Sequence, residues 1–306
     1  MTDSRPLVWL PWKQEMWGDL PAAFRYEFVD LHDGVPDNFE DVEVYVPAFG
    51  METSIAEPIL RMKGLRYVQT MTAGAELVRP YVSPDITLCN GRGIHDAATA
   101  ELAVGLALAA LRDLPRYVHN QSQHVWDRRI TKALADSRVM IVGYGSIGGA
   151  IERRLEPFEV EIVRVARTAR DNVHAFTELP TLLPDVDVVI LITPLTDETR
   201  GLVDAEFLAQ MKDGALLVNV ARGGVVVTED LVAALETGRI HAALDVTDPE
   251  PLPSDHPLWD APNTLIVPHI GGATYADMYR ARNFVVQQLG RYASGEPLLN
   301  VLAGDY

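Results

Sequence analysis

The chain has 306 residues, enough for two domains, because single hydrophobic cores rarely grow beyond about 250–300 residues. Its composition, 48% hydrophobic and 23% charged, excludes a disordered chain, and its net charge of −17 argues against a nucleic-acid partner. Cys89 is the only cysteine, so the chain has no intrachain disulfide and no CxxC pair, and we expect no metal site.

The N-terminal residues lack the apolar core of a signal peptide. The apolar run Leu102–Leu111 is about half as long as a membrane span and is typical of a buried helix. These two features predict a cytoplasmic protein with no membrane partner.

In chain order, the first ninety residues alternate short apolar runs with turn-rich polar stretches. This pattern predicts a helix over Ser54–Met62 and strands over Leu7–Leu10, Arg25–Val29, Val42–Val46, Leu65–Gln69 and Ile86–Leu88. A long alanine-rich helix is predicted from Asp96 to Leu114, where Pro115 would end it.

From Arg138 onward, nearly unbroken apolar strands alternate with helices, which indicates a parallel sheet covered on both faces. The predicted strands are Val139–Val142, Val160–Val165, Val186–Ile192, Ala215–Val220, His241–Leu244 and Thr264–Val267. A last helix is predicted from Ala273 to Ala293, with Tyr275, Met278, Phe284, Val285 and Leu289 facing a core. We expect it to pack on the N-terminal domain, which makes that domain discontinuous.

A glycine-rich segment follows the first of these strands: Gly143, Tyr144, Gly145, Ser146, Ile147 and Gly148. Between a strand and a helix, G-x-G-x-x-G favours a dinucleotide site, because Gly143 can make the turn, Gly145 admits a pyrophosphate and Gly148 lets the helix pack closely. The helix N-terminus offers N–H groups to phosphates. A glycine-rich turn without a ligand is the alternative.

The end of the next strand bears on which cofactor binds. An NAD site usually carries an acidic residue there, whereas this chain has Ala166. Arg167, Thr168 and Arg170 could instead bind a 2′-phosphate through charge and hydrogen bonds. We predict NADP(H) as the preferred cofactor, with NAD(H) as the secondary one; a solvated arginine cluster is the alternative.

Three later segments each follow a predicted strand, where ligands of open α/β sheets bind. Arg222 can bind a carboxylate with two N–H groups and polarise the adjacent carbonyl. Hydride addition to a carbonyl creates an alkoxide that needs a proton, and His269 can supply it. Glu250 would orient the imidazole and favour its charged form. Taken alone, His269 could equally be structural, and Glu250 could belong to a solvated turn.

In order and in sequence, these segments resemble the signatures of the D-isomer-specific 2-hydroxyacid dehydrogenase family. The matching segments are Gly143–Gly148, Thr193–Thr199, Asn219–Gly224, Asp245–Pro251 and Pro268–Gly272. The resemblance implies two Rossmann-like domains with parallel sheets, and cofactor and substrate in the interdomain cleft. The substrate-binding domain would comprise residues 1–95 and 271–306, and the dinucleotide-binding domain, with a dimerisation helix, residues 96–270.

The resemblance also implies roles for single residues. His269 would be the general acid/base, Glu250 its partner, and Arg222 the group that orients the substrate carboxylate. Ala73 and Gly74 match a loop whose N–H groups bind that carboxylate, although an ordinary strand–helix turn would look similar. Further cofactor contacts would come from Thr193, Pro194, Thr199, Val220, Ala221, Asp245 and Gly271.

Within the family, the missing acidic residue at Ala166 and the chain end at Tyr306 favour glyoxylate/hydroxypyruvate reductases. The expected function is reduction of a small anionic 2-keto acid to the D-2-hydroxy acid by a homodimer. The alternatives are a corepressor-like, cofactor-sensing binding protein, and a dehydrogenase of another substrate such as phosphite or 3-phosphoglycerate.

Overall fold

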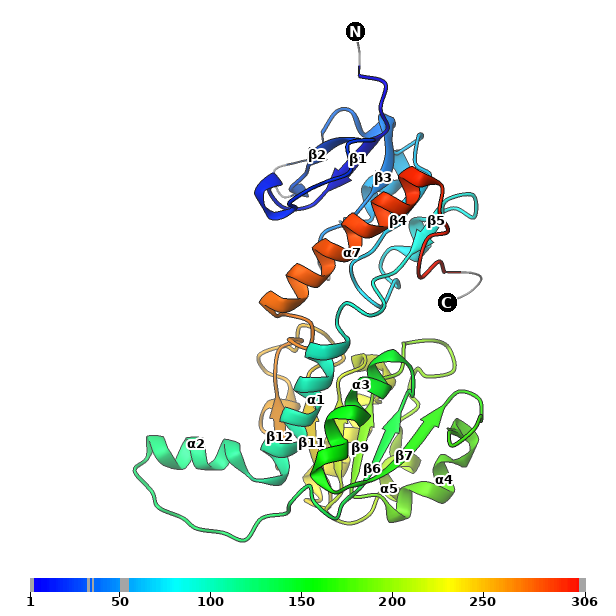
Figure 1. Cartoon of the computed structure of the whole chain (residues 1–306). Helices are drawn as coiled ribbons and strands as arrows, with labels where there is room; N and C mark the ends of the chain where they lie inside the picture. Colours follow the sequence, from blue (N-terminus) through cyan, green and yellow to red (C-terminus); the bar gives the residue numbers. More distant parts are fainter. Residues whose placement is uncertain (1–2, 32–33, 35, 50–54, 303–306) are drawn as a thin grey trace. The chain divides into compact units, whose positions relative to one another are not determined.

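The computed structural model describes residues 3–31, 34, 36–49 and 55–302 (Figure 1). The chain forms two compact units. The first contains Met1–His95 and Tyr275–Tyr306, and the second contains Asp96–Thr274. The first unit is therefore built from two separate parts of the sequence.

The first unit contains a five-stranded parallel sheet in the order β2-β1-β3-β4-β5. Its strands are β1 Leu7–Leu10, β2 Arg25–Phe28, β3 Val42–Tyr45, β4 Tyr67–Gln69 and β5 Thr87–Cys89. All five lie within or beside the predicted runs. Where a helix was expected over Ser54–Met62, the structure has a short 3₁₀ helix over Glu57–Arg61; Ser54 itself lies outside the described residues. Pro58 at the start of this segment has no N–H to extend a regular helix backwards.

Helix α7, Tyr275–Ser294, packs against the first unit's sheet, beside β1, β3 and β4 in Figure 1. Its apolar contacts come from Ala281, Val285 and Leu289, all fully buried. The expectation for Tyr275 was wrong, because this side chain is 86% exposed. The buried face is set by Asp277 and Ala281, and two residues of helix rotate Tyr275 by about 200° away from Asp277.

The second unit contains a seven-stranded parallel sheet in the order β12-β11-β10-β9-β6-β7-β8. The strands are β6 Arg138–Val142, β7 Glu161–Ala166, β8 His174–Ala175, β9 Val188–Leu191, β10 Leu216–Asn219, β11 His241–Leu244 and β12 Thr264–Ile266. The parallel α/β fold predicted from the apolar strands is confirmed. β8 was not predicted, because two residues are too few to show a hydrophobic pattern.

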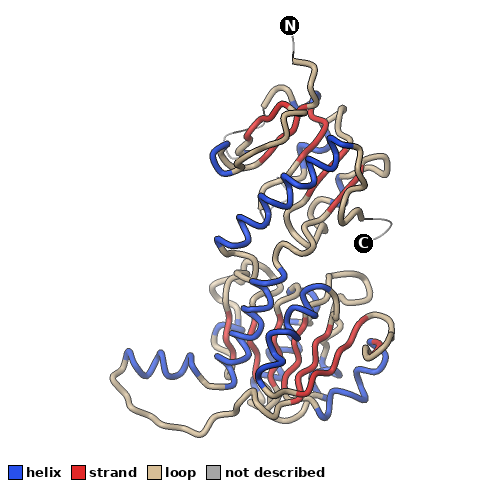
Figure 2. Tube along the Cα trace, viewed as in Figure 1, coloured by secondary structure: helices blue, strands red, loops and turns tan. Residues whose placement is uncertain are grey.

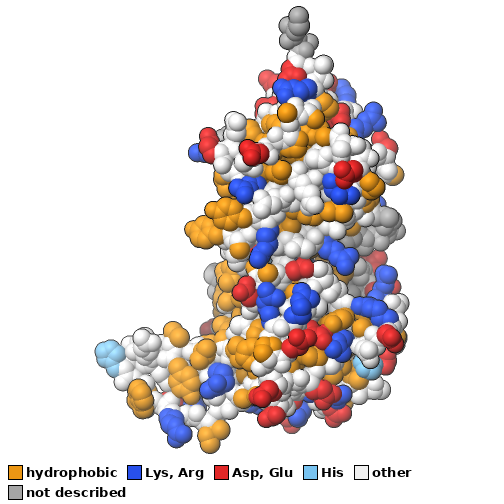
Figure 3. All heavy atoms as spheres, viewed as in Figure 1, with side chains coloured by type: hydrophobic (Ala, Val, Ile, Leu, Met, Phe, Trp, Pro, Cys, Tyr) orange, Lys and Arg blue, Asp and Glu red, His pale blue; other side chains and the backbone are white. Residues whose placement is uncertain are grey.

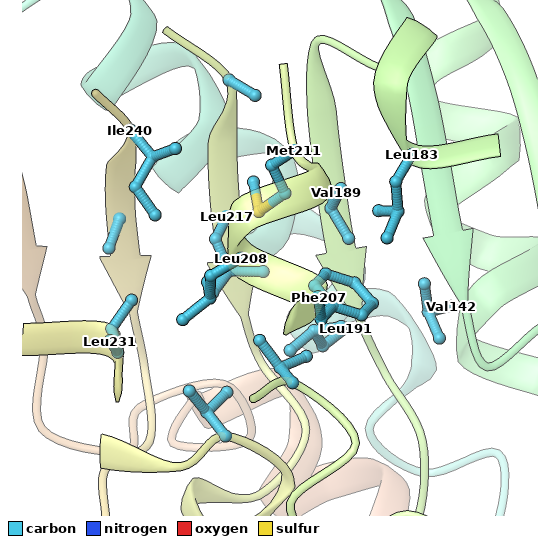
Figure 4. Close-up of a cluster of buried hydrophobic side chains, with 14 of the residues drawn as sticks. Val142, Leu183, Val189, Leu191, Phe207, Leu208, Met211, Leu217, Leu231 and Ile240 are labelled. Carbon is cyan, nitrogen blue, oxygen red and sulfur yellow. The ribbon is translucent and has the colours of Figure 1, made fainter. Parts of the chain in front are cut away.

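Two hydrophobic cores cover the two faces of this sheet. Met140 and Val142 of β6 face one core with α4 Leu179–Leu182, α5 Ala205–Gln210 and α6 Thr228–Glu236 (Figure 4). Val139 and Ile141 face the other, with α1 Asp96–Leu111 and α3 Ser146–Leu155. Alternate side chains of a strand point to opposite faces, so a strand buried on both sides is apolar throughout.

Helix α1 ends at Leu111, and a second helix, α2, runs from Leu114 to Ser122. We expected Pro115 to end a helix, but it lies in the first turn of α2, where a proline loses no hydrogen bond. Figures 1 and 2 show α2 and the following irregular stretch, residues 123–133, extending away from the rest of the second unit. We call residues 114–133 the arm.

The arm exposes large apolar side chains, with Trp126 97% and Ile130 100% exposed. Figure 3 shows apolar side chains gathered on this part of the surface. Among the described helices, none has both the length and the apolar character that crossing a membrane requires.

Candidate active site

The predicted site residues of the second unit follow the carboxyl ends of neighbouring strands. Because β7, β6, β9, β10, β11 and β12 are adjacent and parallel, these ends share one edge of the sheet. Along this edge stand, in order, Arg167, the glycine loop 143–148, Thr193, Arg222, Asp245 and His269. With strands about 4.8 Å apart, the row is roughly 24 Å long. The strand order reverses between β6 and β9, which is where ligands of such sheets bind.

The glycine loop has the shape that a pyrophosphate site needs. Gly143 has φ +107°, and a Cβ there would lie 2.5 Å from the Ile192 carbonyl oxygen. A Cβ on Gly148 would lie 2.6 Å from the Gly143 carbonyl oxygen, so α3 packs closely against the loop. A Cβ on Gly145 would meet no atom within 4 Å, which leaves the front of the loop open.

The first turn of α3 faces this open side. Within the described chain, the N–H groups of Ser146, Ile147 and Gly148 donate to no protein acceptor, as is usual at a helix N-terminus. The Ser146 hydroxyl donates to Asp96. Free N–H groups and the helix dipole favour an anion at this position, so the loop fits a dinucleotide phosphate.

A polar cluster behind the loop was not predicted from sequence. Glu152 of α3 accepts hydrogen bonds from the Tyr144 hydroxyl and from two nitrogens of Arg164 on β7, including Nε at 2.9 Å. Mainly through its hydrogen bonds, the Arg164 guanidinium holds the pKa of Glu152 below its usual value. The cluster joins the loop, α3 and β7. Its only sequence signal was an arginine within a largely apolar strand.

The segment after β9 adds an unusual polar atom. The Thr193 hydroxyl is buried and, among the described residues, has no hydrogen-bond partner. Thr199 has an internal role instead: its hydroxyl donates to the Pro194 carbonyl at 2.6 Å and accepts from the Thr196 N–H at 2.8 Å. An orphaned hydroxyl beside the glycine loop fits a site that a bound molecule completes.

The three residues proposed for the 2′-phosphate follow β7. Arg170 donates to the Tyr144 carbonyl oxygen, and its guanidinium lies 6.0 Å from the centre of the Tyr144 ring. Arg167 is exposed and lies 4.0 Å from the Glu198 carboxylate. Thr168 is exposed as well. The structure thus brings Arg170 to the glycine loop and leaves Arg167 in solvent.

Arg222 occupies a turn stiffened by Asn219 of β10. The Asn219 side chain accepts from the Ala221 N–H at 3.0 Å and donates to the Arg222 carbonyl at 3.1 Å. The Arg222 guanidinium is partly buried and donates to the Ala221 carbonyl at 2.7 Å. Val220 and Ala221 are buried in this turn.

His269 and Glu250 are paired as the sequence suggested. Nδ1 of His269 and Oε1 of Glu250 are 2.6 Å apart, and both side chains are partly exposed. A carboxylate can only accept hydrogen bonds, so Nδ1 carries the proton of this contact. Nε2 is thereby left to exchange a proton with a substrate.

Asp245 supports the turn that carries His269. Its two carboxylate oxygens accept from the N–H groups of Ile270, at 2.7 Å, and Gly271, at 3.0 Å. The Asp245 carbonyl accepts from the His269 N–H at 2.7 Å. Burial raises the pKa of Asp245, against the two N–H donors. His269 has φ +52°, a backbone conformation that costs free energy and that these bonds hold in place.

The loop that contains Ala73 and Gly74 lies in the first unit, after β4. The Asn90 side chain donates to the Ala73 carbonyl at 2.6 Å, and the Thr72 hydroxyl donates to the Gly74 carbonyl at 2.6 Å. Within the described part of the chain, the Gly74 N–H has no acceptor. This loop therefore has a backbone donor available to an anion. In the described ranges, no cluster of three or more His, Cys, Asp and Glu side chains could hold a metal ion.

Comparison with known proteins identifies the family to which the chain belongs. Residues 104–271 match the family model described as "D-isomer specific 2-hydroxyacid dehydrogenase, NAD binding domain". The chain is 42% identical to the glyoxylate reductase/hydroxypyruvate reductase of Mus musculus over 60% of each chain. It is 30% identical to a hydroxypyruvate reductase of Blautia hydrogenotrophica over 94% of each chain.

A solved structure agrees with these matches. The NADPH-dependent glyoxylate/hydroxypyruvate reductase of Sinorhizobium meliloti, crystallised with NADP and malonate, superimposes with a TM-score of 0.81 at 27% identity. The match covers 98% of this chain and 97% of that one. The chain therefore belongs to the D-isomer-specific 2-hydroxyacid dehydrogenase family of oxidoreductases.

Proposed function

We propose that this protein reduces a small 2-keto acid of the glyoxylate/hydroxypyruvate type to the D-2-hydroxy acid, with NADP(H) as the preferred cofactor. The second unit would bind the cofactor through the glycine loop, and Arg222 with the Ala73–Gly74 loop would bind the substrate carboxylate. The observation that carries the proposal is the 2.6 Å His269–Glu250 pair on the sheet edge that also holds the glycine loop. The relatives named above support the substrate class.

The proposed chemistry divides among these residues. The bound nicotinamide supplies the hydride. Arg222 holds the substrate carboxylate and polarises the neighbouring carbonyl, which gathers negative charge as the reaction proceeds. His269 Nε2 gives a proton to the resulting alkoxide, while Glu250 keeps Nδ1 protonated and the ring oriented. Fixed orientation supplies much of the rate in such a reaction.

Cofactor preference is proposed from the end of β7. No carboxylate stands at Ala166 to bind the ribose hydroxyls of NAD, and Arg167, Thr168 and Arg170 follow it. Arg170 already lies at the loop, where it donates to the Tyr144 carbonyl. The S. meliloti neighbour, described as NADPH-dependent, agrees with this preference.

We also propose that the active form is a homodimer. The arm exposes Val118, Trp126 and Ile130, and isolated chains rarely leave several large apolar side chains of one segment in water. A second copy of the chain would cover them.

The decisive experiment measures oxidation of NADPH and of NADH by absorbance with a panel of 2-keto acids. Phosphite and 3-phosphoglycerate, the alternative substrates, are tested in the opposite direction, in which they would reduce NADP⁺ or NAD⁺. We expect turnover of glyoxylate or hydroxypyruvate with NADPH. His269→Asn should reduce kcat by about 10²–10⁴-fold, the usual contribution of general acid catalysis. His256→Asn, a histidine outside this site, is the control. Cofactor binding without turnover of any substrate would favour the sensing protein instead.

A further inference from the structure

In the loop that follows β4, the four consecutive carbonyl groups of residues 71–74 all have hydrogen-bond partners within the protein. His95 Nε2 lies 3.0 Å from the Met71 carbonyl oxygen, and the Gly91 N–H donates to the Thr72 carbonyl at 2.7 Å. The Ala73 carbonyl accepts from Asn90 at 2.6 Å, and the Gly74 carbonyl accepts from Thr72 at 2.6 Å. No carbonyl in this stretch depends on solvent alone.

These anchors set the direction of the loop's donors. In a planar trans peptide, the carbonyl and the following N–H point in opposite directions. A bond to the Met71 carbonyl therefore fixes the Thr72 N–H, and the bond to the Ala73 carbonyl fixes the Gly74 N–H. Within the described residues, neither of these two N–H groups has an acceptor. The loop is thus arranged to present donors to an anion.

His95 is the anchor that connects the loop to another element. Its Nδ1 lies 3.2 Å from Oδ2 of Asp277 on α7, a fully buried carboxylate that also accepts from Arg280 at 3.0 Å. The ring of Phe49 packs edge-on against the imidazole, with centroids 5.6 Å apart. The ring is therefore confined between α7, Phe49 and the loop, and it is only slightly exposed.

Both ring nitrogens of His95 face oxygen acceptors. A neutral imidazole has one N–H and could satisfy only one of them, whereas the doubly protonated ring donates to both. The bond to Asp277 holds the ring in place, and the bond to Met71 transmits that position to the loop.

We propose that His95 is a positioning residue for the substrate: it orients the backbone donors of loop 71–75 that receive the substrate carboxylate. The proposal rests on the keto acid reductase function above. It assigns His95 no contact with the reacting atoms. Its loss should therefore weaken binding of the carboxylate without comparably changing cofactor binding or the chemical step.

Two amide variants separate the two contacts of the ring. The amide nitrogen of His95→Gln can reach the position of Nε2 and keep a donor for the Met71 carbonyl, whereas the shorter side chain of His95→Asn reaches only the Asp277 side. We expect His95→Asn to raise KM for the keto acid and the Kd of oxamate, a non-reacting analogue, by roughly tenfold, about the effect of one misplaced hydrogen bond to a charged group. His95→Gln should recover most of this loss.

The readouts are KM, kcat, oxamate Kd in the presence of NADPH, and NADPH Kd from its fluorescence. We expect kcat and NADPH Kd to stay within about twofold in both variants, because neither substitution touches the glycine loop or His269. His174→Gln removes another histidine–carboxylate pair, the 2.8 Å contact with Glu178, and should leave KM for the keto acid unchanged.

Three results would overturn the proposal. Equal effects of the Asn and Gln variants would show that the Met71 contact is irrelevant, and a parallel loss of NADPH binding would show a general structural defect. Unchanged oxamate binding in His95→Asn would remove the residue from substrate positioning. A wild-type protein that binds NADPH but neither binds oxamate nor reduces any keto acid would instead overturn the proposed function on which the inference depends.

Discussion

At the scale of single residues, the turn after β12 shows how a strained backbone is kept in one conformation. His269 has φ +52°, which a non-glycine residue adopts at a cost in free energy. Asp245 offsets this cost by accepting the N–H groups of Ile270 and Gly271 with its two oxygens. The sequence resemblance implied a cofactor contact for Asp245, and the structure shows that its carboxylate anchors the backbone directly after His269.

Asp245→Asn should therefore harm both stability and catalysis. Asparagine has one acceptor oxygen, and its NH₂ group would face a backbone N–H, so one buried donor loses its partner. We expect the free energy of unfolding to fall by about 1–3 kcal/mol, as for other unsatisfied buried groups. Urea unfolding measures this change, and kcat should fall more than the affinity for NADPH. Wild-type stability together with wild-type kcat would contradict the role given to Asp245.

Arg167 tests the cofactor preference at the same scale. It is exposed and has only the 4.0 Å contact with Glu198, so Arg167→Ser should leave the fold unchanged. If Arg167 binds the 2′-phosphate, KM for NADPH should rise by roughly tenfold or more, since charge-assisted hydrogen bonds to phosphate are strong. KM for NADH should not change. Arg153→Ser, an exposed arginine on α3, is the control, and an equal effect on both cofactors would contradict the assignment.

At the scale of elements, hydrophobic pattern was sufficient for strands and insufficient for short or polar segments. β9 and β10 are buried on both faces, so an uninterrupted apolar run identified them. β8 has two residues, and α2 has no buried residue, so neither carries a pattern of burial. The strand ends also fixed which side chains share an edge, which is why His269 and Glu250 could be paired from sequence.

Other contacts between polar side chains of different segments could not be predicted from the sequence. Glu152 lies 12 residues from Arg164, and nothing in the spacing shows that α3 and β7 bring them together. The same holds for His95 and Asp277, which are 182 residues apart. Pairs of this kind depend on how the elements pack, which a single sequence does not specify.

The Glu152 cluster supplies a prediction with a defined pH dependence. The Arg164 hydrogen bonds lower the pKa of Glu152 from its usual 4.5, so the folded state favours the ionised form. Its stabilising effect is therefore fully present above pH 4.5 and is lost as the pH falls through the lowered value. Glu152→Gln should be less stable than the wild type at pH 7, and the difference should shrink on acidification below 4.5. Chemical unfolding at several pH values measures it; a difference independent of pH would contradict the role of charge.

At the scale of the whole molecule, the two compact units are built differently from the sequence. One uninterrupted stretch forms the seven-stranded unit, and α7 returns to complete the five-stranded one. The sequence indicated this return, because a helical run with apolar spacing follows the last parallel strand. The sequence did not indicate the arm, because nothing in the chain's apolar pattern showed that these side chains lie in solvent.

The exposed apolar side chains of the arm lead to a prediction about assembly. Trp126 and Ile130 are almost completely exposed, so they contribute little to the stability of a single chain, and removing them should not unfold it. If they bind a second copy, Trp126→Ser should raise the dimer dissociation constant by about thirtyfold or more, because buried tryptophans are frequent hot spots of interfaces. Sedimentation velocity over a range of concentrations measures this. Leu60→Ser, which removes an exposed leucine outside the arm, should leave the dimer intact. A wild-type protein that stays monomeric at micromolar concentration would leave these side chains without the partner proposed for them.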